Sequence, residues 1–198
     1  MTQDTDWEAL YRETRHRIGN TMQMLLSLLR LQMRKETPDA RDALARLEVR
    51  MSAAAAAYAL ARVVGEDGVT LVVDFAAYIG DMSEEARRQT EPDMAPEVTL
   101  DLVPAEIPLD QAIPAGVAIT EVLMNAVQHG GPPIHVRMEA LAEAGVWRVA
   151  IRDGGTGVPE AGGRGDGLGL RIAESLMRQV KGRLATDGGT VTLEWPAR

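Results

Sequence analysis

Three polar residues recur at four-residue spacing in the segment ITEVLMNAVQHG: Glu121, Asn125 and His129. This spacing places them on one face of an otherwise apolar helix. A carboxylate, an amide oxygen and an imidazole in line suit the binding of a hard cation and a proton-transfer step. A solvent-exposed polar stripe would have the same spacing, so these residues alone leave both interpretations open.

A second candidate lies in the segment RDGGTGVP, where Asp153 is expected at the end of a strand. A carboxylate fixed there can accept a hydrogen bond from an exocyclic amine such as that of adenine. The glycines that follow, among them Gly155 and Gly157, would let the backbone approach a flat ring. A tight loop after a strand is the alternative interpretation.

The third candidate is the glycine-rich segment GGRGDGLGL (162–170), which runs directly into a predicted helix. Glycine-rich backbone amides at a helix N-terminus can bind phosphate groups. The segment does not match the dinucleotide-binding fingerprint, because the last glycine of that pattern is missing and no strand directly precedes the segment. It does not match a P-loop either, because no Lys-Ser or Lys-Thr follows. A flexible loop remains the alternative.

His16 is the fourth candidate, with Asn20 one helical turn later. On a helix, His16 lies about 160° from Ile18, outside the apolar face. A surface histidine without chemistry fits this position. So does a nucleophile, because an exposed neutral imidazole on a rigid helix can be phosphorylated on nitrogen and reached by a partner.

The elements that carry these residues begin with a helical hairpin. Residues 4–35 contain no proline, the segment ETPD (36–39) ends the first helix, and a second helix extends to GEDG (65–68). Its apolar positions alternate at three and four residues, as in a bundle seam: Leu44, Leu47, Met51, Ala54, Tyr58 and Ala61. Because the first helix also carries a second apolar stripe at Met24, Leu28 and Leu31, we expect two hairpins to form a dimeric four-helix bundle.

The remaining two-thirds of the chain predicts an α+β domain with helices on one face of a sheet. Helices are expected at residues 74–88, 110–129 and 170–180, and strands at 97–102, 134–141, 145–152 and 189–195. Asn125 then lies within the helix 110–129, Asp153 directly follows the strand 145–152, and Gly167 precedes the helix 170–180.

The amino-acid composition limits the classes of partner and the cellular compartment that we expect for this chain. The 198 residues include 21 basic and 29 acidic ones, a net charge of −8, which disfavours nucleic acid and anionic membranes as partners. The chain contains no cysteine, which excludes disulfides and thiolate metal sites and fits a cytoplasmic protein. The first residues do not form a signal peptide, and no apolar run is long enough to span a membrane.

Together these segments resemble the catalytic core of bacterial sensor histidine kinases, in the group related to the HWE kinases (the second type of HisKA domain). The segment ETRHRIGNTMQMLLSLLRLQ (13–32) resembles the phosphoacceptor box of that group, which has the pattern E-x-x-H-R-x-x-N-x-x-Q. ITEVLMNAVQHG is similar to its N box, RDGGTGVP to its D box and GDGLGLRIAESL (165–176) to its glycine box. The resemblance extends from Glu13 to Trp195.

The resemblance implies roles for the polar candidates. His16 would be the phosphorylated histidine, and Asn20 would position a partner's aspartyl phosphate or a water. Glu121 would be the general base for His16, Asn125 a Mg²⁺ ligand, and His129 a neighbour of the phosphates.

The resemblance also implies an ATP site. Asp153 would bind the adenine amine, in a pocket shaped by Gly155 and Gly157. Other positions would line the triphosphate or support the adenine end: Arg164, Gly167, Gly169 and Thr190.

The implied fold is a dimerisation and histidine phosphotransfer hairpin (residues 1–66) followed by a Bergerat-type ATP-binding α/β sandwich (residues 70–198). The implied activity is ATP- and Mg²⁺-dependent autophosphorylation of a histidine, with transfer to an aspartate of a response-regulator receiver domain. The implied assembly is a homodimer.

The sequence departs from the pattern of this family at two places. Gln128 stands where the N box usually has a lysine or arginine, and the stretch 157–165 is short for an ATP lid. Arg164 and Arg171 would then supply the positive charge. A phosphotransferase or receiver phosphatase with a weakened ATP site is therefore the second hypothesis, and a non-catalytic dimeric adaptor the third. Because no sensor precedes Asp4 in this sequence, we expect a separate sensor or regulator protein to control it.

Overall fold

The computed structural model describes residues 7–64, 70–89, 96–155 and 167–197. The chain divides into two compact units. The first, here called the hairpin unit, comprises Met1–Asp74 and Glu106–Ile113, and the second, the sheet unit, comprises Phe75–Ala105 and Pro114–Arg198. Each is described separately.

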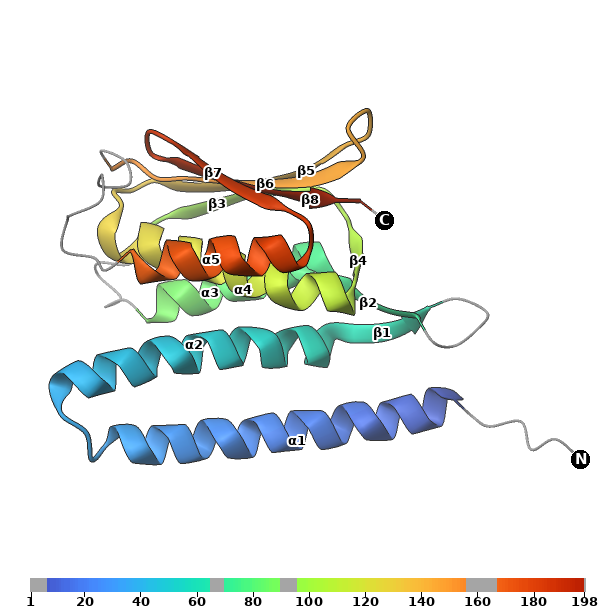
Figure 1. Ribbon diagram of the computed structural model, residues 1–198, viewed down its shortest axis with the longest axis vertical. Coiled ribbons are helices and arrows are strands. Elements are labelled where there is room, and N and C mark those ends of the chain that lie inside the picture. Colours follow the sequence, from blue (N-terminus) through green and yellow to red (C-terminus); the bar gives the residue numbers. More distant parts are fainter. Residues whose placement is uncertain (1–6, 65–69, 90–95, 156–166, 198) are drawn as a thin grey trace, which may run out of the picture. The chain divides into compact units, whose positions relative to one another are not determined.

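Two long helices form the hairpin unit's main part, α1 (Trp7–Met33) and α2 (Pro38–Leu60) (Figure 1). The predicted break between them is confirmed, because Thr37 has an extended backbone and Pro38 starts α2, where a missing N–H costs nothing. Arg41 fixes the connection, since its guanidinium donates to the carbonyls of Met33 at 3.2 Å and Glu36 at 3.3 Å.

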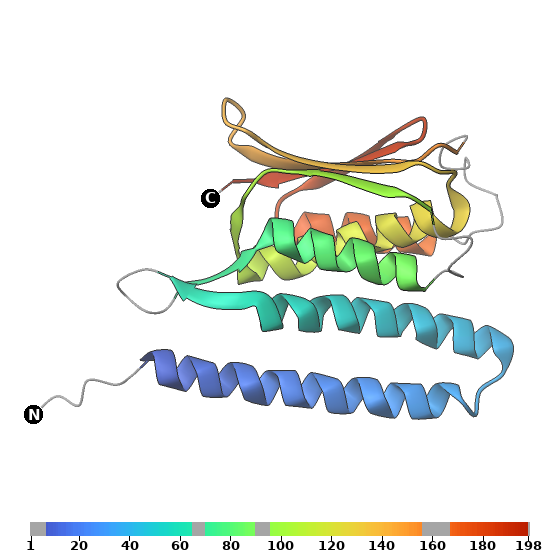
Figure 2. The same cartoon turned by 180° about the vertical axis from the view of Figure 1, so that it is seen from behind.

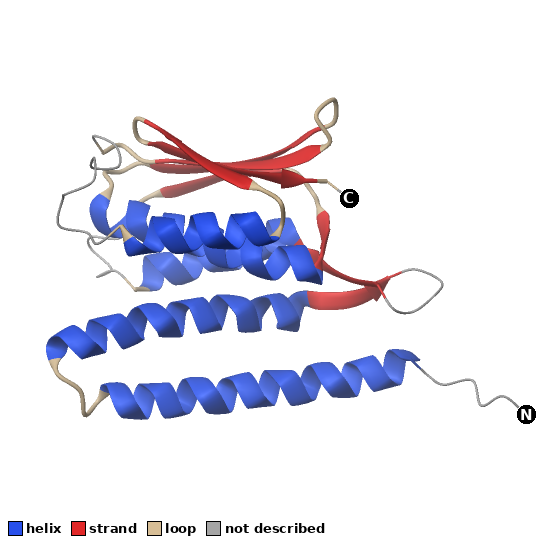
Figure 3. Cartoon of the chain, viewed as in Figure 1, coloured by secondary structure: helices blue, strands red, loops and turns tan. Residues whose placement is uncertain are grey.

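The end of the second helix differs from the prediction. The helix stops at Leu60, and Ala61 begins a strand instead of continuing the apolar seam (Figure 3). This strand, β1 (Ala61–Val64), pairs antiparallel with β2 (Thr70–Asp74), which in turn pairs with β4 (Glu106–Pro108). Val63 and Val64 are β-branched and gain strand partners here, which outweighs helix propensity in the last turn.

The sheet unit contains a five-stranded sheet with the order β3-β5-β6-β8-β7. Its strands are β3 (Val98–Leu102), β5 (Ile134–Leu141), β6 (Val146–Arg152), β7 (Arg183–Asp187) and β8 (Thr190–Pro196). β3 runs parallel to β5, and the other neighbours are antiparallel. The four predicted strands are confirmed, while β7 was not predicted.

Three helices cover one face of this sheet, as Figures 1 and 2 show. They are α3 (Phe75–Arg88), α4 (Leu109–His129) and α5 (Leu168–Gln179), all three close to their predicted ranges. The α+β fold class predicted from the sequence is therefore confirmed.

The core of the sheet unit lies between the sheet and its helices. Inward-facing strand residues are buried, among them Met138, Ile151 and Leu193. Phe75 packs edge-on against Trp195, with ring centroids 5.7 Å apart. Gly116 on α4 makes room for the fully buried Tyr78, because a Cβ at this position would overlap the tyrosine ring.

Within the described residues, none of the helices is both long and apolar enough to cross a membrane.

Candidate functional site

The C-terminal end of α4 meets the end of β6 in the sheet unit. The helix is extended by a bond from the Gly130 N–H to the Ala126 carbonyl at 2.9 Å. A Cβ at Gly130 would lie 2.7 Å from Cγ of Asp153, so only glycine lets the chain pass this close to the carboxyl group. The N box and the D box therefore adjoin in space.

Asp153 is held in place from two sides. Its N–H donates to the Gly189 carbonyl at 3.0 Å, and its Oδ1 accepts the N–H of Gly155 at 2.8 Å. Among the described residues, no hydrogen bond is formed to the other carboxylate oxygen of this half-buried side chain. That oxygen is available to accept a bond from an amine such as that of adenine.

Two glycine-containing segments complete the packing around Asp153. The Gly154 N–H donates to the Gly131 carbonyl at 2.6 Å. A Cβ at Gly189 would lie 2.9 Å from the carbonyl oxygen of Asp153 and 3.3 Å from that of Gly155. Sequence reasoning missed these contributions of Gly130, Gly131 and Gly189. Their signal was present as the paired glycines GG at 130–131 and 188–189.

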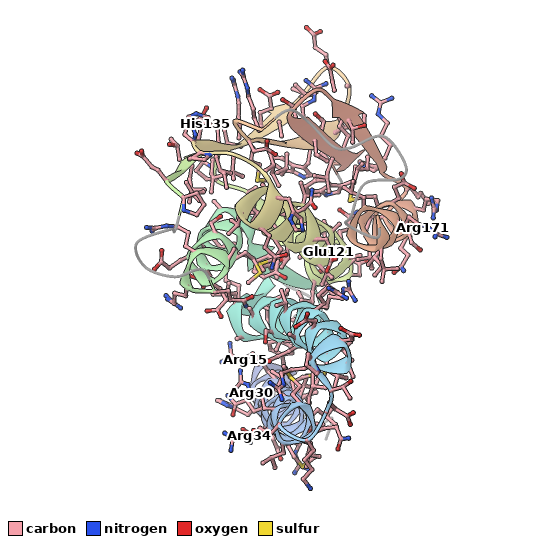
Figure 4. The ribbon with its side chains drawn as sticks, turned by 90° about the vertical axis from the view of Figure 1, so that its left-hand side faces the viewer. Arg15, Arg30, Arg34, Glu121, His135 and Arg171 are labelled. Carbon is pink, nitrogen blue, oxygen red and sulfur yellow. The ribbon has the colours of Figure 1, made fainter. Side chains whose placement is uncertain are left out.

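Glu121 lies on α4, one helical turn before Asn125, and opposite the start of α5. A Cβ at Gly169 would lie 2.9 Å from Oε2 of Glu121, so the glycine segment and this carboxylate are direct neighbours. Figure 4 shows Glu121 between α4 and α5. Gly167 precedes α5 with a positive φ of 52°, a conformation that favours glycine, and its carbonyl accepts the N–H of Arg171 at 3.0 Å.

The remaining predicted residues of the sheet unit are distributed around this cluster. Asn125 is half-buried on α4 between Glu121 and the Asp153 contact, while His129 at the end of the helix is exposed. Thr190 is half-buried at the start of β8, directly after Gly189, and pairs with Arg152 and Asp187. Gly157 and Arg164 lie outside the described residues.

Arg171 is not directed at this cluster. It is exposed on α5 and lies about 200° around the helix from Gly169, which faces Glu121. In Figure 4 its side chain extends on the outer side of α5. Of the two arginines expected to supply positive charge, this one therefore points away from Glu121.

The residues present fit a magnesium nucleotide. No group of three or more acidic or histidine side chains that could hold a metal occurs in the described part of the chain. Mg²⁺ needs no such group when phosphates supply most of its ligands, and one amide oxygen such as that of Asn125 suffices beside them. Asp153, the close glycine backbone and the start of α5 offer an amine acceptor, space for a ring and backbone N–H groups.

His16 and Asn20 are exposed on α1 in the hairpin unit. Neighbouring side chains have partners: Arg17 pairs with Glu13 at 2.7 Å, and Arg15 donates to the Ala61 carbonyl at 3.3 Å. The imidazole is thus presented on an ordered helical surface, as nucleophilic attack on a phosphoryl group requires.

Comparison with known protein families matches both parts of the chain. Residues 13–90 match the family described as histidine kinase, and residues 98–195 match the histidine kinase-like ATPase domain. The chain belongs to the histidine kinases. The matched ranges contain the phosphoacceptor box and the three boxes of the ATP domain.

Two characterised histidine kinases illustrate the relationship. Blue-light-activated histidine kinase 2 of Erythrobacter litoralis is 26% identical over 200 residues, which cover 96% of this chain and 56% of that protein. Sensor-type histidine kinase PrrB of Mycobacterium tuberculosis is 31% identical over 116 residues, which cover 50% of this chain and 24% of that protein. The chain thus spans about half of the first relative's length and about a quarter of the second's.

Solved histidine kinase structures share the fold. The histidine kinase domain of an Erythrobacter litoralis blue-light activated histidine kinase superposes with a TM-score of 0.62 at 23% identity, covering 98% of this chain and 93% of that one. The mycobacterial sensor histidine kinase MprB gives a TM-score of 0.52 at 22% identity, covering 64% of this chain and 98% of that one. The chain is therefore a histidine kinase core in fold, with a helical hairpin followed by an ATP-binding α/β domain.

Proposed function

We propose that this histidine kinase core transfers the γ-phosphoryl group of ATP to His16 and then to an aspartate of a response-regulator receiver domain. The observation that carries the proposal is the cluster around Asp153, where two glycine pairs adjoin the helix that carries Glu121 and Asn125, and where one carboxylate oxygen accepts no hydrogen bond from any described residue. This arrangement offers an acceptor for the adenine amine beside groups suited to Mg²⁺ and proton transfer.

Each residue has a definable task in this mechanism. Bound ATP with Mg²⁺ would supply the phosphoryl group and neutralise part of its charge. Asp153 accepts a hydrogen bond from the adenine amine and fixes the base. Asn125 offers its amide oxygen to the cation, and Glu121 accepts the proton that the His16 imidazole loses as its nitrogen attacks.

The other site residues position the reacting groups. In this proposal the backbone at Gly167 and Gly169 binds the triphosphate, and Arg164 and His129 lie beside the phosphates. The adenine pocket is formed by Gly155, Gly157 and Thr190. Asn20, one turn from His16, would orient the acyl phosphate or a water during transfer or hydrolysis. Catalysis would then consist of positioning and charge neutralisation.

The proposal includes a homodimer formed through the hairpins. Its support is the second apolar stripe of α1, where Met24 and Leu28 are each 56% exposed and Leu31 is 55% exposed. Burying this stripe against a second copy would remove three large apolar side chains from water.

A second candidate is a histidine phosphotransferase or receiver phosphatase that has lost ATP binding. The observation that favours it is a lack of positive charge where the phosphates of ATP would lie. Gln128 stands where the family pattern has a basic residue, and Arg171 faces away from Glu121. In this case His16 and Asn20 would act alone on phosphoryl groups received from another protein.

Labelling with γ-³²P ATP and Mg²⁺ tests the proposed function. We expect acid-labile label on the wild-type chain and none on His16→Gln, because the imidazole is the acceptor. The matched control is His135→Gln, which removes another exposed histidine, on β5, and should keep full labelling. Label that persists on His16→Gln would refute the assignment of the acceptor.

A further inference from the structure

We propose that the outer face of the five-stranded sheet carries a binding site for an organic carboxylate with an apolar body, separate from the cluster around Asp153. The site is a hollow of about 340 Å³ at the end of the sheet where β5 turns into β6. We call it the sheet hollow. Apolar side chains line one part of it, and charged side chains line the other. This inference goes beyond the proposed function and does not depend on it.

One part of the sheet hollow is apolar. Strand pairing places Leu141 opposite Val146, and Val146 opposite Pro196, so these three residues form a row across β5, β6 and β8. All three are half-buried and line the hollow. The row therefore offers apolar contact area to the body of a ligand.

The next row on the same face is charged. Arg148 lies opposite Glu194, and Glu194 lies opposite Arg183, each two residues along its strand or beside it from the apolar row. The Glu194 side chain is 9% exposed and accepts bonds from Nε of Arg148 at 2.6 Å and from Nε of Arg183 at 2.7 Å. The buried carboxylate thus orients both guanidinium groups, which lowers the cost of ordering them around a ligand.

Arg183 keeps hydrogen-bond donors for a ligand. Its Nε and Nη2 both approach Oε2 of Glu194, at 2.7 Å and 2.5 Å, whereas its Nη1 donates to none of the described residues. The Arg183 side chain is 76% exposed, so the edge formed by Nη1 and Nη2 is accessible. Such a planar guanidinium edge matches the two oxygens of a planar carboxylate.

A third cation comes from the turn between α5 and β7. Lys181 is exposed, lines the hollow and has a φ of 57°, in the left-handed region that side chains other than glycine rarely adopt. The following position needs Gly182, because a Cβ there would overlap the carbonyl oxygen of Glu194. Backbone strain of this kind is concentrated at functional sites, so the lysine supports a role for the hollow.

The positive charge of the hollow contrasts with its surroundings. The sheet unit contains 11 basic and 16 acidic residues, a net charge of −5. Around the hollow, three cations lie beside one carboxylate, a net charge of +2. Glu139 also contacts Arg148, but Arg137 pairs with this glutamate at 3.2 Å and balances its charge. A locally positive hollow in an acidic unit attracts an anion to that place.

A carboxylate on an aliphatic body fits both parts of the hollow. Its volume of about 340 Å³ lies near the lower end of the roughly 300–1,000 Å³ of small-molecule sites. Inorganic phosphate would leave the apolar row uncovered, and a neutral apolar molecule would leave the cations without a partner. A free aliphatic acid and the C-terminal residue of a peptide share the required chemistry.

Backbone amide NMR of the ¹⁵N-labelled full chain tests this site. The probes are 4-methylpentanoate, as a free acid, and N-acetyl-alanyl-leucine, as a peptide end. We expect saturable shifts of the Gly182 and Arg183 amide signals with a dissociation constant of about 1 mM for at least one probe. The tighter of the two identifies the source of the carboxylate. The neutral 4-methylpentanamide, which has the same body, should bind about tenfold more weakly.

Two substitutions connect binding to the named cations. Arg183→Gln should weaken binding of the tighter probe about tenfold. The matched control Arg178→Gln, which removes another exposed arginine of the sheet unit, should bind like wild type. Lys181→Gly leaves Glu194 with both arginines and serves if Arg183→Gln does not fold. It should raise the melting temperature, because glycine adopts the positive φ without strain, and weaken binding about threefold.

Three results would overturn the inference: no saturable shift with either acid, equal affinity for the acid and the amide, or wild-type affinity of both Arg183→Gln and Lys181→Gly. Binding of inorganic phosphate as tightly as the acids would also overturn it, because the hollow would then be a general anion site. These outcomes do not depend on nucleotide binding, so failure of the proposed function would leave them unchanged.

Discussion

At the scale of single residues, the site depends on backbone contacts as much as on side-chain chemistry. Asp153 is the side chain proposed to read adenine, but its position is set by glycines from three separate segments. Each of these glycines brings a carbonyl or N–H group closer than a Cβ would permit. The polar side chains and the glycines therefore form one unit.

Gly189→Ala is predicted to weaken nucleotide binding about tenfold, because its Cβ would lie 2.9 Å from the Asp153 carbonyl oxygen and displace the end of β6. The measurement is titration with an ATP analogue and Mg²⁺. Gly80→Ala is the control, since a Cβ at Gly80 meets no atom within 4 Å. Equal affinity of Gly189→Ala and wild type would show that this contact does not position Asp153.

The side-chain part of the site could be predicted from the sequence, and the backbone part could not. Glu121 and Asn125 share a face at helical spacing, and Asp153 follows an alternating strand, so local periodicity suffices for them. The approach of Gly130 and Gly189 to Asp153 depends on which strands are neighbours. That order, with β8 beside β6, is a long-range property that local pattern does not encode.

At the scale of elements, the sequence predicts long periodic elements better than short ones. The helices and the strands β3, β5, β6 and β8 of the sheet unit follow from their apolar spacing. The segment RLATD of β7 has one large apolar residue, Leu184, so it shows no alternation, whereas the equally short β3 alternates Val98, Leu100 and Leu102. β1 has four residues and continues a helical pattern, so only its pairing with β2 defines it.

On the outer face of the five-stranded sheet, a buried carboxylate connects three neighbouring strands. Glu194 on β8 accepts bonds from Arg148 on β6 at 2.6 Å and from Arg183 on β7 at 2.7 Å, and its side chain is 9% exposed. Burial alone raises the pKa of this carboxyl group, but the two arginines outweigh burial and hold the pKa below its ordinary value of 4.5.

Stability is therefore predicted to depend on Glu194 in acid. Because the folded-state pKa is depressed, the stabilisation is complete above pH 4.5 and is lost as the pH falls through the folded-state value. Glu194→Gln should lower the free energy of unfolding by about 1–2 kcal/mol at pH 7 and less at low pH. Urea unfolding at several pH values measures this, with the exposed Glu143→Gln as control. A loss that does not shrink in acid would contradict the ion-pair explanation.

At the scale of the whole molecule, the chain combines a basic segment, residues 7–64 of the helical hairpin, with an acidic remainder. The net charge of the chain is −8, but residues 7–64 contain ten basic and six acidic residues, a net charge of +4. The acidic remainder includes the proposed ATP site, where Gln128 supplies no positive charge.

Nucleotide binding is the measurement that tests the central claim most directly, because it separates a kinase from a phosphotransferase with the same fold. In calorimetry with a non-hydrolysable ATP analogue, we predict one-to-one binding with Mg²⁺, weaker binding with EDTA and none for Asp153→Asn. The variant should retain the wild-type melting temperature within a few degrees. Absence of binding by the folded wild-type chain with Mg²⁺ would contradict the kinase assignment and leave His16 as a phosphotransfer residue.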